Sequence, residues 1–481
     1  MLLDALQKYA ATDAVAMHMP GHKRNVVAFP WLGALGGALD ITEIEGFDNL
    51  NLPQGLFREL EQSAAALWGA KESVCLVNGS TVGILASVRA VLIGGGALLL
   101  DRGSHRSLYH AAELAGAQTY YLLPPVHPDF GIRGAIAPQA VEKALCEHPD
   151  VRLVAVTSPT YEGVISDIQG IAEVCHAHGA LLLVDEAHGA HLGFGDFPQN
   201  AIRYGADLAV QSLHKTLPSL TQTAILHMGD SAVTSGAIDP VNVRRNVVML
   251  QTSSPSYLLS TSIDGCVDYL AREGNAAANR WLAALDGFRA RTADLQKIRI
   301  LPTDAKEGFA FAVDPSKIVI STSGLSVDGS NLSGVALAAL LREEFSIELE
   351  MAAGSYALAM TGMGDTAATL SRLADALLAI DARCGKPSDP APATAFSLPK
   401  KRLPATAALA APGEFCPLPD AIGRISAEYV FAYPPGVPLL VPGEIVDKTV
   451  LRTIQTAVDG GENLHSTRES LPHRIFCVKE S

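Results

Sequence analysis

The sequence predicts an α/β fold: a large domain with a mixed, mostly parallel sheet, followed by smaller α+β pieces. Residues 151–157 and 180–184 are nearly all apolar, and segments of helical periodicity lie before and after them. Strands that are covered on both faces of a parallel sheet have continuous apolar runs of this kind. Hydrophobic residues make up 48% of the 481 residues and charged residues 18%, which excludes disorder as the main state. A chain of this length is too long for one compact core, so we expect roughly two or three domains.

Residues 1–55 predict a short helix and an extended arm. Residues 2–10 have the pattern of an amphipathic helix, which the turn-rich residues 19–24 end. From residue 29 to residue 55 the periodicity is poor, and Gly, Pro and Asn are frequent. Such an arm cannot bury itself, so we expect it to lie on another domain or on another subunit.

Residues 56–255 predict the large domain, because helices and strands alternate through them. The predicted helices are residues 56–68, 82–93, 107–115 and 139–146, and the predicted strands are residues 73–77, 97–100, 119–122, 151–157, 180–184 and 207–210. The segment between Asp185 and Lys215 is long enough for a further helix and one strand.

Three more regions are expected after residue 255. Residues 256–384 predict a small α+β region with helices at 263–290 and 334–344 and a strand at 318–321. Residues 385–412 are rich in Pro and Ala, which is typical of a linker. Residues 413–481 predict a C-terminal domain with a helix near 448–458.

The charge balance argues against nucleic acid as a partner. Lys and Arg number 36 against 50 Asp and Glu, which gives a net charge of −14, and no basic block is present that would follow a phosphate backbone. Charged residues interrupt the first apolar positions, and no apolar run approaches the length of a membrane span. We therefore expect no targeting segment and no membrane contact.

The seven cysteines are scattered and odd in number, and no C-x-x-C pair occurs among them. This pattern indicates neither a disulfide framework nor a zinc site. We expect no metal ion and a reducing, cytoplasmic location.

A first candidate for chemistry is the segment Asn78-Gly79-Ser80-Thr81, which joins a predicted strand to a helix. The start of a helix offers backbone N–H groups and the positive end of the helix dipole to an anion, and Ser80 and Thr81 add two hydroxyls. The alternative is an ordinary helix cap, since Ser and Thr are also preferred there. The segment is therefore a candidate phosphate site.

Asp185 follows the apolar strand at 180–184 and is a candidate partner for a heterocyclic nitrogen. A carboxylate beside such a nitrogen favours its protonated form. The string Asp-Glu-Ala-His at 185–188 also occurs in ATP-dependent helicases, but these need a G-x-x-x-x-G-K-[ST] loop, and the sequence has none. His105, after the strand at 97–100, is a candidate for stacking on an aromatic ring, although a lone loop histidine is more often solvated.

Lys215 lies in the polar run Ser212-Leu213-His214-Lys215-Thr216, just after the strand at 207–210. Polar side chains at the carboxyl ends of strands are where α/β sheets bind ligands. Most such strings are surface turns. Here, however, a phosphate site, a histidine, a carboxylate and a lysine follow successive predicted strands, which is the arrangement needed to bind a phosphorylated pyridine aldehyde.

The chain resembles the ornithine/lysine/arginine decarboxylase family, which are pyridoxal 5'-phosphate (PLP) enzymes of the aspartate-aminotransferase fold (fold type I). The resemblance is to the short form without an N-terminal wing domain. The motifs that carry it span nearly the whole chain in the family's order: Met19-Pro20-Gly21-His22-Lys23, Thr42-Glu43, residues 78–83, His105-Arg106-Ser107, residues 158–163, 185–191 and 212–216, Ser254-Pro255-Ser256-Tyr257, residues 433–436 and Pro442-Gly443-Glu444.

The resemblance implies a role for each candidate. Lys215 would hold the cofactor as an internal aldimine, Asp185 would pair with the pyridine nitrogen, and His105 would stack over the ring. His188 would lie beside the reacting carbon, and His214 or Lys215 would protonate it. The phosphate site would be lined by Ser80, Thr81, Ser212 and His214, with Thr252 reaching the phosphate of a neighbouring subunit. Arg106 departs from the family, since many members have lysine there, and residues 45–49 vary around the acidic arm.

The implied activity is decarboxylation of a basic L-amino acid in polyamine biosynthesis, with arginine (to agmatine) favoured over lysine (to cadaverine) and ornithine (to putrescine). The implied assembly is a homodimer or larger, with the active site at the subunit interface. Acidic candidates for the cationic substrate tail are Glu43, Glu45, Asp48, Glu428 and Glu444. Two alternatives stay open: another fold type I activity, such as an aminotransferase or a lyase, and a cofactor-binding regulator without catalysis.

Overall fold

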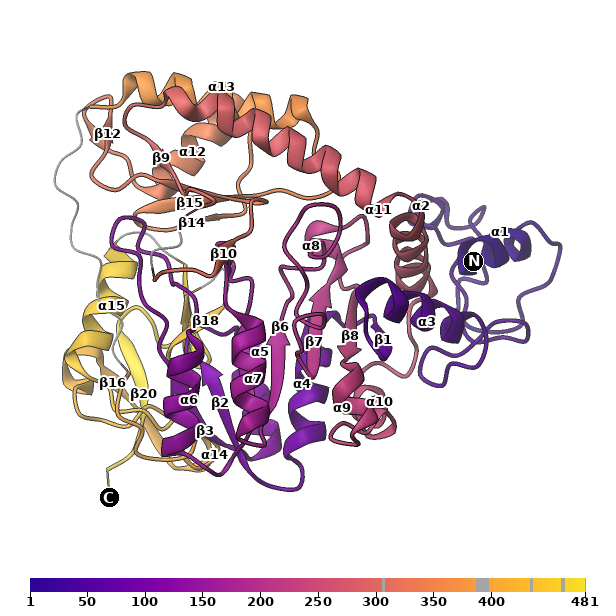
Figure 1. The fold of residues 1–481 in the computed structure, drawn as a ribbon, viewed down its shortest axis with the longest axis horizontal. Coiled ribbons are helices and arrows are strands. Elements are labelled where there is room, and N and C mark those ends of the chain that lie inside the picture. The colour runs from indigo at the N-terminus through magenta and orange to yellow at the C-terminus, as the bar shows by residue number, and fades with distance from the viewer. Residues whose placement is uncertain (305–307, 386–397, 433–435, 460–462, 481) are drawn as a thin grey trace. The chain divides into compact units, whose positions relative to one another are not determined.

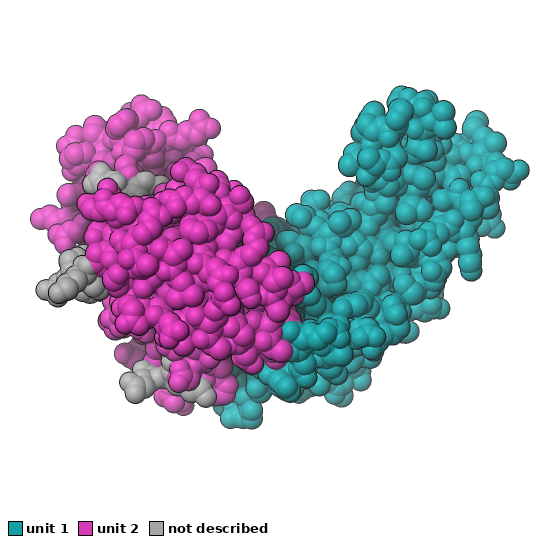
Figure 2. Space-filling view, turned by 90° about the horizontal axis from the view of Figure 1, so that it is seen from above, with its two compact units in different colours: residues 1–94, 168–280, 362–364 teal, residues 95–167, 281–361, 365–481 magenta. Residues whose placement is uncertain are grey.

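The computed structural model describes residues 1–304, 308–385, 398–432, 436–459 and 463–480. These residues form two compact units, which Figure 2 colours separately. Unit 1 comprises residues 1–94, 168–280 and 362–364, and unit 2 comprises residues 95–167, 281–361 and 365–481. Each unit is thus assembled from segments that are far apart in the chain. The linear domain boundaries expected from the sequence stay a prediction.

Unit 1 combines the arm with four strands and the helices around them (Figure 1). Its strands are β1 (Glu72–Leu76), β6 (Leu181–Asp185), β7 (Leu208–Ser212) and β8 (Ala224–Met228). Its helices are α1 (Leu2–Ala10), α2 (Pro30–Ala34), α3 (Leu56–Trp68), α4 (Gly79–Leu92), α7 (Ile168–Ala177), α8 (Leu213–Thr216), α9 (Asp230–Thr234), α10 (Pro240–Leu250) and the first part of α11 (Tyr257–Arg291).

The unit 1 strands lie in the order β1-β8-β7-β6. β6 and β7 are parallel, and β8 runs antiparallel to both β7 and β1. β1, β6 and β7 therefore run in one direction and end at the same edge. The strand register shows the shared edge, because Leu76 at the end of β1 and Ser212 at the end of β7 both pair with Ala224. The predicted mixed α/β sheet is confirmed.

Helix α4 packs closely on these strands because residue 83 is glycine. A Cβ atom on Gly83 would lie 2.8 Å from Leu76 Cδ1 and 2.8 Å from Val210 Cγ1. Any larger residue would push α4 away from the ends of β1 and β7. The close approach keeps the first turn of α4, which carries Ser80 and Thr81, near Ser212.

Unit 2 contains the parallel strands β4-β2-β3 and several small sheets. Its strands are β2 (Ala97–Asp101), β3 (Gln118–Leu122), β4 (Val151–Thr157), β5 (Val164–Ile165), β9 (Arg299–Ile300), β10 (Ala312–Val313), β11 (Lys317–Ser321), β12 (Ser326–Val327), β13 (Ser330–Asn331), β14 (Met351–Ala352), β15 (Tyr356–Met360), β16 (Gly413–Pro417), β17 (Val430–Ala432), β18 (Val437–Leu440), β19 (Leu464–Ser466) and β20 (Arg474–Val478). Its helices are α5 (Arg106–Ala115), α6 (Pro138–Glu147), α12 (Gly334–Phe345), α13 (Ala367–Arg383), α14 (Ala405–Ala410) and α15 (Lys448–Asp459).

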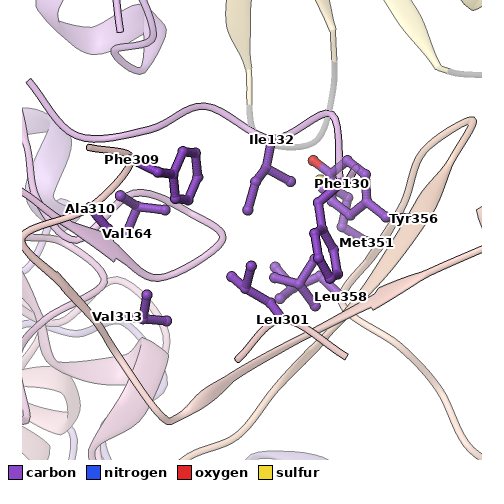
Figure 3. Packing of buried hydrophobic residues seen from close by; sticks show 11 residues of the cluster. Phe130, Ile132, Val164, Leu301, Phe309, Ala310, Val313, Met351, Tyr356 and Leu358 are labelled. Carbon is purple, nitrogen blue, oxygen red and sulfur yellow. The ribbon is translucent and has the colours of Figure 1, made fainter. Parts of the chain in front are cut away.

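One apolar cluster of unit 2 joins segments that are distant in sequence. Figure 3 shows Phe130 and Ile132 facing Leu301, Met351 and Leu358. The cluster buries β14 and β15 against the loop that follows β3, so the antiparallel sheet β14-β15-β11-β9 has an apolar core of its own.

The structure departs from the predicted elements at two places that matter for the site. Helix α4 begins at Gly79 rather than at residue 82, so Ser80 and Thr81 belong to its first turn. The segment between Asp185 and Lys215 is long enough for a helix, but residues 186–207 form turns, bends and irregular loop instead. Gly193, Gly195 and Gly205 have φ values of +87°, +55° and +92° there, a backbone conformation that breaks a right-handed helix.

Two predicted features lie partly or wholly outside the described residues. These are Tyr433-Pro434-Pro435 and the part of the predicted linker at 386–397; within the remaining linker, residues 405–410 form α14. Among the described residues, no helix is both long and apolar enough to cross a membrane.

Candidate active site

Lys215 lies in α8, a single helical turn that begins directly where β7 ends (Figure 1). Leu213 is fully buried and anchors this turn, while Lys215 is half-buried. The Lys215 Nζ atom lies 2.7 Å from Nε2 of His188, which follows β6. The two side chains predicted to meet the reacting carbon are therefore in hydrogen-bond contact.

Asp185 is the last residue of β6 and is buried. Its Oδ1 accepts a hydrogen bond from the Ala187 N–H at 3.2 Å. Burial raises the pKa of Asp185, and the nearby Lys215 charge and the Ala187 hydrogen bond lower it less than burial raises it. A buried carboxylate of this kind gains from a further cationic partner, and a protonated pyridine nitrogen is such a partner.

His214 is held by the backbone of the following loop. Its Nδ1 donates to the Thr223 carbonyl at 3.0 Å, and burial lowers the pKa of the imidazole. The neutral ring that this favours offers Nε2 as an acceptor. Such a ring suits proton exchange near the lysine, whereas a phosphate would require the charged imidazolium, so the predicted phosphate role of His214 stays a prediction.

The first turn of α4 is open toward a ligand. Asn78, at the N-cap position, does not cap its own helix; its Oδ1 accepts from the Thr252 N–H at 3.1 Å instead. Among the described residues no side chain caps this helix, so the N–H groups near Ser80 and Thr81 are available to an anion. The Asn78 contact also brings Thr252 to the same end of α4.

Ser212 strengthens the case for an anion here. Its hydroxyl oxygen is buried and has no hydrogen-bond partner among the described residues. Leaving a buried hydroxyl without a partner costs free energy, and a phosphate oxygen would supply the missing acceptor. Ser212 lies one strand from the end of β1, which leads into α4. The residues present therefore fit the phosphate of a cofactor.

All the predicted catalytic and cofactor-binding residues except His105 belong to unit 1. His105 belongs to unit 2 and is the N-cap of α5, where its Nδ1 accepts from the Ser107 N–H at 3.2 Å. This contact orients the imidazole ring, and the predicted stacking of His105 on a cofactor stays a prediction.

Two of the acidic candidates for the substrate tail are buried in unit 2 and already have partners. Glu444 is fully buried, lies 3.2 Å from Arg102 Nη2 and accepts from the Val441 N–H at 2.8 Å. Glu428 is fully buried and accepts hydrogen bonds from Ser470 and from backbone N–H groups. Both carboxylates stabilise the C-terminal part of unit 2.

A third acidic candidate, Asp48, is used by the backbone of the arm. Its carboxylate accepts from the N–H groups of Gln54, Gly55 and Phe57, and these hydrogen bonds lower its pKa although burial acts in the opposite direction. Glu43 and Glu45 remain exposed.

Sequence reasoning missed the side chain of Asn78 and the role of Gln222. Gln222 has a φ of +79°, and its carbonyl accepts from the Gly79 N–H at 2.8 Å. The only sequence signal was an asparagine immediately before a helix, which also suits a cap. Within the part of the chain that the structure describes, no group of acidic, His or Cys side chains is arranged to hold a metal ion.

Comparison with protein families gives two matches. A model described as "Orn/Lys/Arg decarboxylase, major domain" matches residues 1–368, and one described as "Orn/Lys/Arg decarboxylase, C-terminal domain" matches residues 400–464. Together they extend over most of the chain.

Similar curated proteins include two arginine decarboxylases. The one from Bacillus subtilis is 33% identical over 488 residues, with 100% of this chain and 98% of the relative covered. The one from Bacillus anthracis is 31% identical over 492 residues, with 100% and 97% covered.

Solved structures show the fold. The constitutive lysine decarboxylase of E. coli superposes with a TM-score of 0.79 at 20% identity, covering 99% of this chain and 82% of that one. An alanine–glyoxylate aminotransferase from Nostoc sp. superposes with a TM-score of 0.55 at 17% identity, covering 73% and 91%. The predicted fold type I architecture is confirmed, and the chain belongs to the Orn/Lys/Arg decarboxylase family.

Proposed function

We propose that the chain removes the α-carboxylate of a basic L-amino acid as carbon dioxide, with arginine as the preferred substrate and agmatine as the product. The observation that carries the proposal is the contact between Lys215 and His188 beside the buried carboxylate of Asp185. The full-length similarity to two arginine decarboxylases supports arginine over lysine and ornithine.

The cofactor of this reaction is PLP, which when bound withdraws electrons from the carbon that loses carbon dioxide. Lys215 is the residue that would hold its aldehyde carbon, and Asp185 the one that would hold its ring nitrogen. The open first turn of α4 and the hydroxyl of Ser212 would bind its phosphate. Thr252, which Asn78 holds at the same helix end, would line that site or the one of a neighbouring subunit.

The chain's own groups account for the proton steps. The short contact between Lys215 Nζ and His188 Nε2 allows a proton to be shared between them. Lys215 is thus placed to deliver a proton to the carbon that has lost its carboxylate. His214, whose Nδ1 is engaged by Thr223, presents its other nitrogen for the same purpose.

The same chain is proposed to act as a homodimer or larger assembly. Several apolar side chains of the arm are strongly exposed, among them Met17 and Val27 at 88% each and Trp31 at 64%. Exposed apolar groups of this density mark a surface that another chain covers. The exposed Glu43 and Glu45 of the arm would then be candidates for the cationic substrate tail.

We also place the chain in the cytoplasm. All seven cysteines lie within the described residues and are free thiols, six of them buried, which suits a reducing compartment.

The test is a parallel assay of carbon dioxide release from arginine, lysine and ornithine with the PLP-loaded chain. Arginine is expected to react fastest and to yield agmatine. Keto acid formation without carbon dioxide would instead indicate an aminotransferase. PLP binding without turnover of any of the three amino acids would indicate a cofactor-binding regulator.

A further inference from the structure

A chain of buried polar side chains crosses unit 1 on the face of the sheet opposite to Asp185 and Ser212. Glu186 follows Asp185, and Gln211 precedes Ser212. Successive residues of an extended segment point to opposite faces of a sheet. Glu186 and Gln211 therefore lie behind the strand ends that carry the proposed active site.

The contacts of this chain link four strands. Gln211 Nε2 donates to Glu186 Oε2 at 2.7 Å, and Gln211 Oε1 lies 3.2 Å from His227 Nε2 on β8. The other ring nitrogen of His227, Nδ1, lies 2.7 Å from the hydroxyl oxygen of Ser73 on β1. All four side chains are at most 3% exposed. The backbone N–H of Ala201 also donates to Glu186 Oε1, at 2.8 Å.

With Glu186 ionised, all the hydrogen bonds between these four side chains run in one direction. A carboxylate only accepts, so Gln211 must turn its NH2 group to Glu186 and its oxygen to His227. His227 then carries its proton on Nε2 and accepts from the Ser73 hydroxyl at Nδ1. The direction runs from Ser73 toward Glu186.

With Glu186 protonated, the hydrogen bonds between the same four side chains can run in the opposite direction. The Glu186 O–H donates to the Gln211 oxygen after the amide rotates by half a turn, and the Gln211 NH2 donates to His227 Nε2. His227 then carries its proton on Nδ1 and donates to Ser73, whose hydroxyl accepts as well as donates. The change adds one proton, on Glu186, and the histidine proton moves between ring nitrogens by exchange with water.

We infer that the chain Ser73–His227–Gln211–Glu186 is a two-direction hydrogen-bond switch, in which a proton on Glu186 reverses the chain and shifts the strand ends that position Asp185 and Lys215. Glu186 is thus a positioning residue, acting through β6 and β7 rather than touching the cofactor. The effect on cofactor binding rests on the proposed function, whereas the reversal itself does not.

The environment of Glu186 places its titration in an ordinary pH range. Burial raises the pKa of Glu186 to about 8 against the opposing hydrogen bonds of Gln211 and Ala201, and burial lowers the pKa of His227 to about 3, so that His227 stays neutral. Other charged or titratable groups on the surrounding elements have their own contacts: Glu61 of α3 with Arg244, Asp207 with His176, His191 with the ring of Phe197, and Lys215 with His188.

The first test follows the His227 tautomer by NMR in the cofactor-free chain labelled with 15N-histidine. In the wild type, the proton is expected on Nδ1 at low pH and on Nε2 at high pH, with the change centred near pH 8. In Glu186→Gln, whose amide mimics the protonated acid, the proton is expected on Nδ1 at every pH. A wild-type tautomer that does not change between pH 6 and pH 9.5 overturns the switch.

Two serine variants distinguish an effect of the hydrogen bonds between Ser73, His227, Gln211 and Glu186 from a general effect of altering the buried core. Ser73→Ala removes the terminal partner of His227 and is expected to move the midpoint of the tautomer change. Ser87→Ala removes a hydroxyl of α4 that is equally buried but has no partner among the described residues, and it is expected to leave the midpoint in place. Equal shifts of the tautomer midpoint in both variants would contradict a role for the hydrogen bonds between these four side chains.

The second test measures the PLP dissociation constant from pH 6 to pH 9.5. The wild-type constant is expected to change by about fivefold or more through pH 8, the lower end of couplings between two sites, and the Glu186→Gln constant is expected to stay at the wild-type low-pH value. A tautomer change without any change in affinity overturns the positioning role. Absence of PLP binding at every pH contradicts the proposed function and leaves the tautomer result standing.

Discussion

Buried polar groups occur in two contrasting settings in this chain. In unit 2, the two Nη atoms of Arg102 donate to the Tyr109 hydroxyl, to the carbonyls of Pro438 and Leu439, and to Glu444, so this buried cation has several partners. In unit 1, the Ser212 hydroxyl has no partner among the described residues, and the buried carboxylate of Asp185 accepts a hydrogen bond from the Ala187 N–H.

The difference separates groups that hold the fold from groups that await a ligand. A buried charge that several partners already engage has little capacity left for a substrate. An incomplete set of partners is tolerated where binding completes it. On this basis we assign Glu444, which the sequence suggested for substrate binding, to the fold, and we propose that Ser212 and Asp185 belong to the site. Four substitutions test the contrast.

The largest effect is expected for Lys215→Ala, which removes the group proposed to hold the cofactor. Turnover and the visible absorbance of the bound cofactor should both be lost. The matched control is Lys71→Ala, a half-exposed lysine of unit 1 that pairs with Asp230 and should leave both unchanged. Full activity of the Lys215 variant would falsify the assignment.

Asp185→Ala should leave the cofactor partly bound and reduce turnover by several orders of magnitude, because the ring nitrogen loses the charge that keeps it protonated. Asp185→Asn keeps the size of the side chain and should be similarly impaired if charge matters. Steady-state rates and cofactor titrations measure both variants. Normal turnover of either one would remove Asp185 from the proposed mechanism.

Glu444→Gln should act on stability instead. Removing one partner of a buried ion pair leaves Arg102 without compensation, and we expect the free energy of unfolding to fall by about 3 to 5 kcal/mol. Glu414→Gln, which breaks the half-exposed contact of Glu414 with Arg424, should cost less than about 1 kcal/mol. Urea unfolding measures both. An unchanged stability with an altered substrate preference would return Glu444 to the substrate site.

The smallest effect is expected for Ser212→Ala. A hydrogen bond to a charged group contributes about 1.5 to 3 kcal/mol, so the variant should bind PLP about ten- to a hundredfold more weakly. The cofactor-free variant should be no less stable than the wild type, because it loses a buried hydroxyl that has no partner. Ser87→Ala should leave PLP affinity unchanged. A destabilised cofactor-free Ser212 variant would mean that this hydroxyl has a structural role.

Much of the architecture was predictable because it depends on local pattern. The apolar run at 151–157 became β4 with the same bounds, and the helix at 56–68 became α3 with the same bounds. The places of Asp185 and Ser212 followed from the strands that precede them. These features arise from periodicity within a few residues, which a single sequence contains.

Other features depended on contacts that no local pattern carries. Helix α4 is left without a side-chain cap because Asn78 bonds to Thr252, and Glu444 is buried because it meets Arg102, which lies in a distant part of the chain. The polar chain from Ser73 to Glu186 exists because four strands lie side by side in an order unlike their order in sequence.

The sequence by itself determined the alternation of helices and strands, the family motifs and the lysine and carboxylate at strand ends, because side-chain periodicity and turn residues act over short distances. Tertiary structure alone decided which carboxylates are exposed, which hydroxyl lacks a partner and which face of the sheet carries the polar chain. Burial and hydrogen bonding depend on what the fold places next to each residue, and those neighbours are mostly distant in the chain.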